Sequence, residues 1–144
     1  MLGWDITDFG SGDFFKIGLL MFTLRIGNFN DKKYTKPYTE KLLIVEDKQV
    51  TPYHFHWSKM EDIINRGGGD LVVKVYNSTE DGKFSDTDVD IYMDVRHFTV
   101  KAGDTVRIKP GESICIQPGV YHSFWAEGGT SSYRRGFQGE RRQS

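Results

Sequence analysis

Apolar residues fall along this chain in short runs, and most runs are separated by glycine, proline, aspartate or asparagine. The runs are rich in β-branched and aromatic residues, and the chain lacks the periodicity of a long amphipathic helix. Expected strands are therefore 17–25, 42–46, 71–76, 90–95, 98–101, 105–108 and 113–117, with a loop at 5–13 and a single helical turn at 62–65. Turn signals about every eight residues predict an all-β domain of the jelly-roll kind, with a closed barrel or two antiparallel sheets.

Length and composition narrow the class of protein. The chain has 144 residues, which suits one domain with a single core. Its formal net charge of −1 gives no bulk attraction to nucleic acid or to an anionic membrane surface. The longest apolar stretch, 17–22, is too short to span a bilayer. The sole cysteine, Cys115, lies between two isoleucines, so we expect a buried free thiol in a reducing compartment, by default the cytoplasm.

The segment 52–68 carries the candidate chemistry. His54 and His56 are separated by one residue, so on an extended backbone both imidazoles leave the same face of a strand. Glu61 follows a segment long enough to turn the chain back toward them, and His122 follows the turn signal Pro118-Gly119. Three imidazoles and one carboxylate suit a divalent metal, although ligand type alone admits manganese, iron, cobalt, nickel or zinc. A His-x-His pair by itself also occurs among ordinary surface residues. His97 has no other candidate ligand near it in the sequence, so we expect it to be a surface residue.

The combined pattern resembles the cupin superfamily. His-x-His, Glu61, Gly68, Gly111, Pro118-Gly119 and His122 follow its double motif between residues 42 and 125. More narrowly, HFHWSKMEDIINRGGG, TDFGSGDFFKIGLLMFTLR, YTKPYTEKLLIVE and KPGESICIQPGVYHSFWAEGG resemble the D-lyxose isomerase family of cupins. The resemblance implies a single cupin barrel over residues 1–130 and interconversion of D-lyxose with D-xylulose, and of D-mannose with D-fructose.

The same resemblance implies a set of site residues. It makes His54, His56, Glu61 and His122 the ligands of a manganese-type ion, makes Lys59 a catalytic acid/base candidate, and implies a homodimer. Moving a carbonyl from C1 to C2 requires a proton transfer through an enediol, and a divalent metal assists by polarising the sugar oxygens as a Lewis acid. Lys59 lies two residues before a ligand, so its ammonium group is within reach of such oxygens, whereas an isolated loop lysine is usually only solvated.

The resemblance ends near the C-terminus. Family members continue after Gly129 into a strand with a second catalytic carboxylate, whereas this chain continues TSSYRRGFQGERRQS. Back-translating 134–144 with suitable synonymous codons and reading one base later gives Gly-Glu-Val-Ser-Lys-Val-Asn-Asp-Asp-Asn, which is family-like. We therefore infer a frameshift near Thr130 and expect 131–144 to be a disordered tail that supplies no strand. The chain also begins near a region that family members reach after an additional segment.

Three functions follow from this sequence. The first is a metal-dependent aldose–ketose isomerase impaired by its altered C-terminus. The second is a metal- and sugar-binding cupin without catalysis, because the glutamate that would act at C2 is absent. The third is another cupin chemistry, such as a dioxygenase or a phosphosugar isomerase, since one fold hosts many reactions. Oxygen uptake by an iron-loaded protein would favour the dioxygenase, and a basic phosphate-binding cluster would favour the phosphosugar enzyme.

Overall fold

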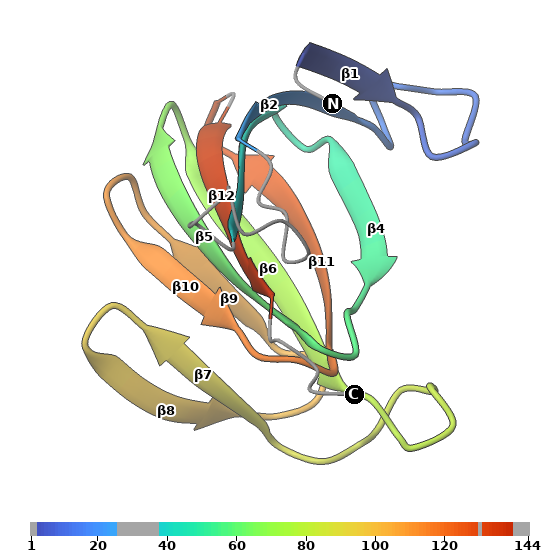
Figure 1. Ribbon diagram of the computed structural model, residues 1–144, viewed down its shortest axis with the longest axis vertical. Helices are drawn as coiled ribbons and strands as arrows, with labels where there is room; N and C mark the ends of the chain where they lie inside the picture. The colour runs from blue at the N-terminus through green and yellow to red at the C-terminus, as the bar shows by residue number, and fades with distance from the viewer. Residues whose placement is uncertain (1–2, 26–37, 130, 140–144) are drawn as a thin grey trace, which may run out of the picture.

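The computed structural model describes residues 3–25, 38–129 and 131–139, and every regular element in these ranges is a β-strand. An eight-stranded sheet has the spatial order β1-β2-β3-β12-β5-β10-β7-β8 (Figure 1). Its strands are β1 (Gly3–Thr7), β2 (Leu19–Arg25), β3 (Tyr38–Val45), β5 (Lys59–Gly67), β7 (Val89–Met93), β8 (Arg96–Val100), β10 (Ser113–Ile116) and β12 (Ser131–Gly139). The expected all-β class is confirmed. No helix in the described ranges is long and apolar enough to cross a membrane.

A four-stranded sheet, in the order β4-β11-β6-β9, faces the larger one. Its strands are β4 (Val50–His54), β6 (Asp70–Asn77), β9 (Thr105–Ile108) and β11 (Val120–Glu127). All pairs of neighbouring strands in the two sheets are antiparallel. Two antiparallel sheets packed face to face are the jelly-roll type of arrangement that the regular turn spacing predicted.

The core lies between the two sheets, because alternate residues of each strand point inward. Strand β6 contributes the buried Leu71, Val73 and Val75, and the larger sheet contributes residues such as Leu43 and Ile63. These residues belong to one hydrophobic cluster that extends from Leu19 to Ala126. This apolar packing holds the two sheets at a fixed separation, and the candidate ligands lie between them.

The turn between β5 and β6 carries the chain from one sheet to the other. Strand β5 ends at Gly67, the first of three consecutive glycines. Gly67 has φ +137° and Gly68 has φ +98°, a conformation that residues with a Cβ rarely adopt. The glycines therefore act as a hinge below the strand that holds Glu61.

Two local predictions are wrong. Residues 62–65, expected as a helical turn, lie within β5, because β10 and β12 pair with both edges of that strand. Residues 5–7, expected as loop, belong to β1, which pairs with β2 from Gly3↔Thr23 to Thr7↔Leu19. In both places the hydrogen bonds of a neighbouring strand outweigh local residue preference.

The expectation of a strandless tail is also wrong for residues 131–139. They form β12, which lies between β3 and β5, with Phe137 opposite Thr39 on one side and Glu61 on the other. Backbone N–H and C=O groups pair whatever the side chain, and β3 and β5 each offer an edge to this position. Residues 140–144 of the expected tail lie outside the described residues, and the frameshift stays a prediction.

Candidate metal centre

Two of the candidate ligands meet across the smaller sheet. His54 is the last residue of β4, His122 lies in β11, and the two are direct register partners. Their ring centroids are 4.1 Å apart. The sequence predicted that both histidines lie on strands but not which residues of the two strands pair. Their adjacency therefore becomes visible only in the folded structure.

The two rings are anchored in the same way. His54 Nδ1 lies 3.0 Å from the carbonyl oxygen of Pro52, and His122 Nδ1 lies 3.0 Å from that of Val120. A carbonyl oxygen only accepts, so each Nδ1 carries the proton and donates it. Each neutral ring then presents the lone pair of its Nε2, which is the form that binds a metal. Sequence reasoning missed these two carbonyls, although each lies two residues before its histidine.

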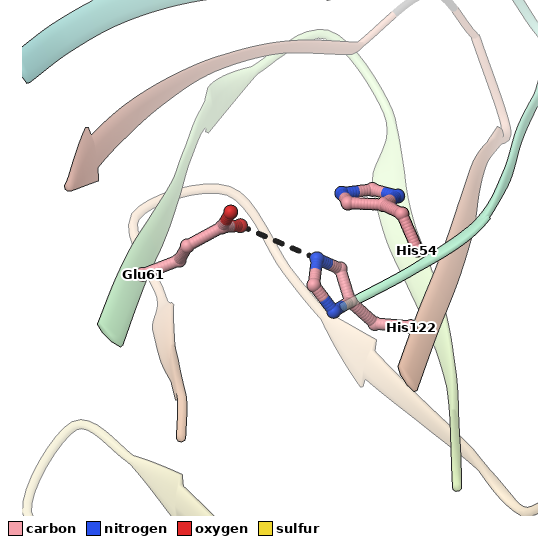
Figure 2. Close-up of side chains that lie close together, drawn as sticks. All are labelled: His54, Glu61 and His122. Carbon is pink, nitrogen blue, oxygen red and sulfur yellow. Dashed lines mark ion pairs between the residues drawn. The ribbon is translucent and has the colours of Figure 1, made fainter. Parts of the chain in front are cut away.

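Glu61 reaches the same point from the opposite sheet. Figure 2 shows its carboxylate directed from β5 toward the imidazoles of His122 and His54. Glu61 and His122 are both 0% exposed, and Glu61 Oε2 lies 3.2 Å from His122 Nε2. Ligand atoms of His54, Glu61 and His122 all lie within 4.8 Å of one another.

The Glu61–His122 contact tests whether these residues fit a metal. The buried Nε2 of His122 has no hydrogen-bond partner in the described part of the chain and lies 3.2 Å from Glu61 Oε2, so the two lone pairs repel unless a proton or a metal ion lies between them. A buried carboxylate also loses its hydration, at a cost of several kcal/mol. A divalent cation satisfies both requirements, because it accepts both lone pairs and neutralises the carboxylate. The donor set therefore fits a divalent metal.

His56 completes the group from its open side. Its Nε2 lies 2.5 Å from the other carboxylate oxygen of Glu61, and its ring centroid lies 5.8 Å from that of His54. It follows the end of β4, and its side chain is 32% exposed. The structure thus brings together the four side chains predicted as ligands, with His56 at the solvent side of the cluster.

His97 has the surface position on a strand that the sequence indicated, whereas Lys59, expected in the turn before Glu61, lies at the start of β5. Lys59 begins β5 two residues before Glu61, so it shares the strand face of that carboxylate, and it is exposed. This placement leaves its role as an acid/base group a prediction. His97 lies on β8, away from the candidate ligands, and its ring stacks on Tyr92 with centroids 4.3 Å apart.

A model of the D-lyxose isomerase family matches residues 1–133. The chain belongs to this family. Its relatives include the D-lyxose/D-mannose isomerases of Escherichia coli O157:H7 and Serratia proteamaculans. The first is 51% identical over 128 residues, 89% of this chain and 56% of that protein. The second is 52% identical over 129 residues, 89% of this chain and 56% of that protein. The chain thus spans little more than half the length of these relatives.

Solved structures support the fold independently of the family match. The L-ribose isomerase of Acinetobacter sp. DL28, in complex with L-ribose, has a TM-score of 0.63 at 15% identity, covering 92% of this chain and 65% of that one. KdgF from Halomonas sp. has a TM-score of 0.57 at 13% identity, covering 96% of this chain and 88% of that one. These likenesses concern the fold alone, which is the cupin type expected for this D-lyxose isomerase family member.

The family match extends past Gly129, where the sequence was expected to depart, and ends at Tyr133. Residues 134–144, with the arginine pairs, lie outside it. The arginine-rich composition of this segment therefore begins where the match ends, while its backbone up to Gly139 still occupies a strand position in the sheet.

Proposed function

We propose that this chain carries the site of a divalent-metal-dependent aldose–ketose isomerase. Its substrates would be D-lyxose and D-xylulose and, less readily, D-mannose and D-fructose. The observation that carries the proposal is the buried 3.2 Å contact between a carboxylate oxygen and the Nε2 of an anchored histidine. Family membership supports the substrate class, since the curated relatives are D-lyxose/D-mannose isomerases.

Each residue has a distinct part in the proposed chemistry. His54 and His122, fixed through their Nδ1 atoms, hold the metal from the smaller sheet, and Glu61 holds it from the larger one. When bound, the metal polarises two adjacent sugar oxygens, which acidifies the proton at C2. His56 binds the metal from the solvent side, and Lys59 donates or accepts a proton at the sugar oxygens. Imidazoles with a hard carboxylate admit manganese, which is the metal we propose.

Removal of the proton at C2 needs a base, and we expect the chain as written to be without the carboxylate that would supply it. The family resemblance places that carboxylate in the strand after Gly129, where this chain has the arginine-rich sequence of β12. We therefore expect the chain to bind manganese and to turn sugar over slowly. Restoring the reading frame after Gly129 should supply the glutamate and rescue the turnover.

The test compares the chain as written with its frame-restored version. Both are dialysed against Mn²⁺, their bound metal is determined by mass spectrometry, and xylulose formation from D-lyxose is followed. We expect stoichiometric metal in both and much faster turnover in the restored version. Absence of bound metal in both would reject the metal centre, and equal turnover would show that the base at C2 lies within residues 1–129.

A second candidate is a metal- and sugar-binding protein without catalysis. The observation that favours it is the foreign sequence of residues 134–144, which lies outside the family match. Binding of Mn²⁺ and D-lyxose with no product from either version would support this candidate. Oxygen uptake by iron-loaded protein would instead support a dioxygenase.

We further propose that the protein is a homodimer and cytoplasmic. Cys115 is a free thiol, which is typical of a reducing compartment. For the dimer, two apolar rows cross the outer face of the large sheet at its β1 edge: Trp4, Phe22 and Leu42 in one, and Ile6, Leu20 and Ile44 in the other. Trp4 is 68% exposed and Ile6 is 52% exposed. Sedimentation analysis of the unaltered chain and of Trp4→Lys tests this face, since we expect a dimer only for the former.

A further inference from the structure

A cluster of aromatic side chains lies behind the candidate ligands, on the outer face of the smaller sheet. Neighbouring side chains of a strand point to opposite faces, so Tyr121 lies outside where His122 lies inside. The outer aromatic cluster consists of Tyr53, Phe55, Trp57, Tyr76, Phe84 and Tyr121. The ring of Phe55, one residue before His56, has its centroid 4.3 Å from that of Tyr121 and 4.6 Å from that of Trp57.

The connection between β6 and β7 supplies one ring of this cluster (the yellow-green loop after β6 in Figure 1). Its Phe84 packs on Tyr121 with centroids 4.7 Å apart and stacks on Tyr76 at 4.5 Å. The Tyr121 hydroxyl donates to the carbonyl oxygen of Gly82 in the same connection. Both a ring contact and a hydrogen bond therefore fasten this loop to the strand that carries His122.

The same loop is tied to the backbone of His56. Gly119 N donates to the carbonyl oxygen of His56 at 2.8 Å, and the Gly119 carbonyl accepts from Ser78 N at 3.0 Å and from Ser78 Oγ at 2.6 Å. Gly119 has φ +79°, and a Cβ there would meet Ser78 Oγ at 3.3 Å, so the site favours glycine. A continuous series of contacts thus runs from the β6–β7 connection to His56.

His56 depends on such support more than His54 and His122 do. Those two histidines lie in strands of one sheet, whereas His56 lies in the β4–β5 connection. We propose that Phe84 and Tyr121 are positioning residues for His56. Phe84 supports the ring of Tyr121, and Tyr121 packs on Phe55, one residue before His56. Together they keep the His56 imidazole against Glu61 and so raise the affinity of the centre for its metal. The inference rests on the metal centre proposed above.

The variants separate the ring contact from the hydrogen bond. Phe84→Ala removes the outer ring, and Tyr121→Phe removes only the hydroxyl that donates to Gly82. Phe15→Ala is the matched control, because Phe15 is 73% exposed and its ring packs on Phe14, away from the cluster. Residues that orient a metal ligand usually change metal affinity by about 10–100-fold. We expect about a tenfold weaker Mn²⁺ affinity for Phe84→Ala, a smaller loss for Tyr121→Phe and no change for Phe15→Ala.

The decisive comparison repeats the measurement in a His56→Ala background. Mn²⁺ dissociation constants are determined by electron paramagnetic resonance of free Mn²⁺, and the Tm of metal-free protein is recorded to monitor folding. If the cluster acts through His56, the loss of affinity seen for Phe84→Ala and Tyr121→Phe disappears in this background, while any change in Tm persists. Equal losses in both backgrounds, or unchanged affinity in both variants, would overturn the inference alone. Absence of Mn²⁺ binding by the unaltered chain would reject the metal centre and this inference with it.

Discussion

The deep and the open sides of the candidate metal centre differ in the burial of their side chains and in how those side chains are held. On the deep side, His122 and Glu61 are fully buried, and the two strand histidines are each fixed by a carbonyl two residues earlier. On the open side, His56 follows the end of β4, and Lys59 is exposed at the start of β5. We propose that the deep side sets whether an ion is held, whereas the open side is where a sugar and its protons would be handled.

The largest effect is expected from the deep side. Glu61→Gln removes the carboxylate charge that contacts both His56 and His122, so bound Mn²⁺ should be lost. Loss of one member of a buried ionic group costs about 3–5 kcal/mol. Metal analysis after dialysis and thermal unfolding with and without Mn²⁺ check this, because an ion that binds only the folded state raises Tm. Asp62→Asn, at the exposed next position, is the control. Stoichiometric binding of Mn²⁺ by Glu61→Gln would show that Glu61 is not a ligand of the metal.

Lys59→Met tests the open side by itself. In the frame-restored version, isomerisation of D-lyxose should fall by roughly 10²–10⁴-fold, which is the usual contribution of a general acid/base. Bound Mn²⁺ should remain, because Lys59 is not a ligand. Lys101→Met, on an exposed position outside the site, serves as the control. Undiminished turnover would show that Lys59 is an ordinary solvated lysine with no part in catalysis.

The two sides are compared most directly by two equivalent truncations. His54→Ala should weaken Mn²⁺ binding about tenfold more than His56→Ala, a difference of about 1.4 kcal/mol. The reason is that His54 is held in a strand beside His122, whereas His56 lies at the exposed rim. Dissociation constants from calorimetry provide the test. A greater loss for His56→Ala would reverse the assignment of the deep and open sides.

The smallest effect concerns Cys115, which lies outside the centre. Burial, helped by the carboxylate of Asp62, raises the pKa of its thiol to about 12. A raised pKa favours the neutral thiol, so only about 10⁻⁴ of it is thiolate at pH 8, against about a quarter for a free cysteine. We expect slow labelling by a disulfide reagent in the native protein, faster labelling as pH rises toward 12, and rapid labelling in urea. Native labelling at the rate of a free thiol would show that Cys115 is not shielded.

The sequence was sufficient to predict elements whose signal is local. The strand 105–108 was predicted with its observed limits, and the candidate ligands came from the two-residue period of His54 and His56 and from the turn before His122. The anchoring of the rings by Pro52 and Val120 was not predictable in this way, because it depends on ring orientation within the pair β4–β11.

Two errors have the same physical cause. Residues 62–65 and 131–139 lack a clear strand pattern, yet both segments are strands because they pair on both edges with neighbours far away in the sequence. Backbone pairing of this kind leaves little trace in local composition. The role proposed for Phe84 was hidden for a related reason, since only the folded loop brings it against Tyr121.

The central claim is that His54, His56, Glu61 and His122 hold one divalent ion. Anomalous diffraction at the manganese edge, from crystals grown with Mn²⁺, tests this claim most directly. The account predicts one strong peak between the sheets, roughly 2.0–2.3 Å from the Nε2 atoms of the three histidines and from a Glu61 carboxylate oxygen. Crystals with no peak there, or with a peak that His122 and Glu61 do not contact, would contradict it.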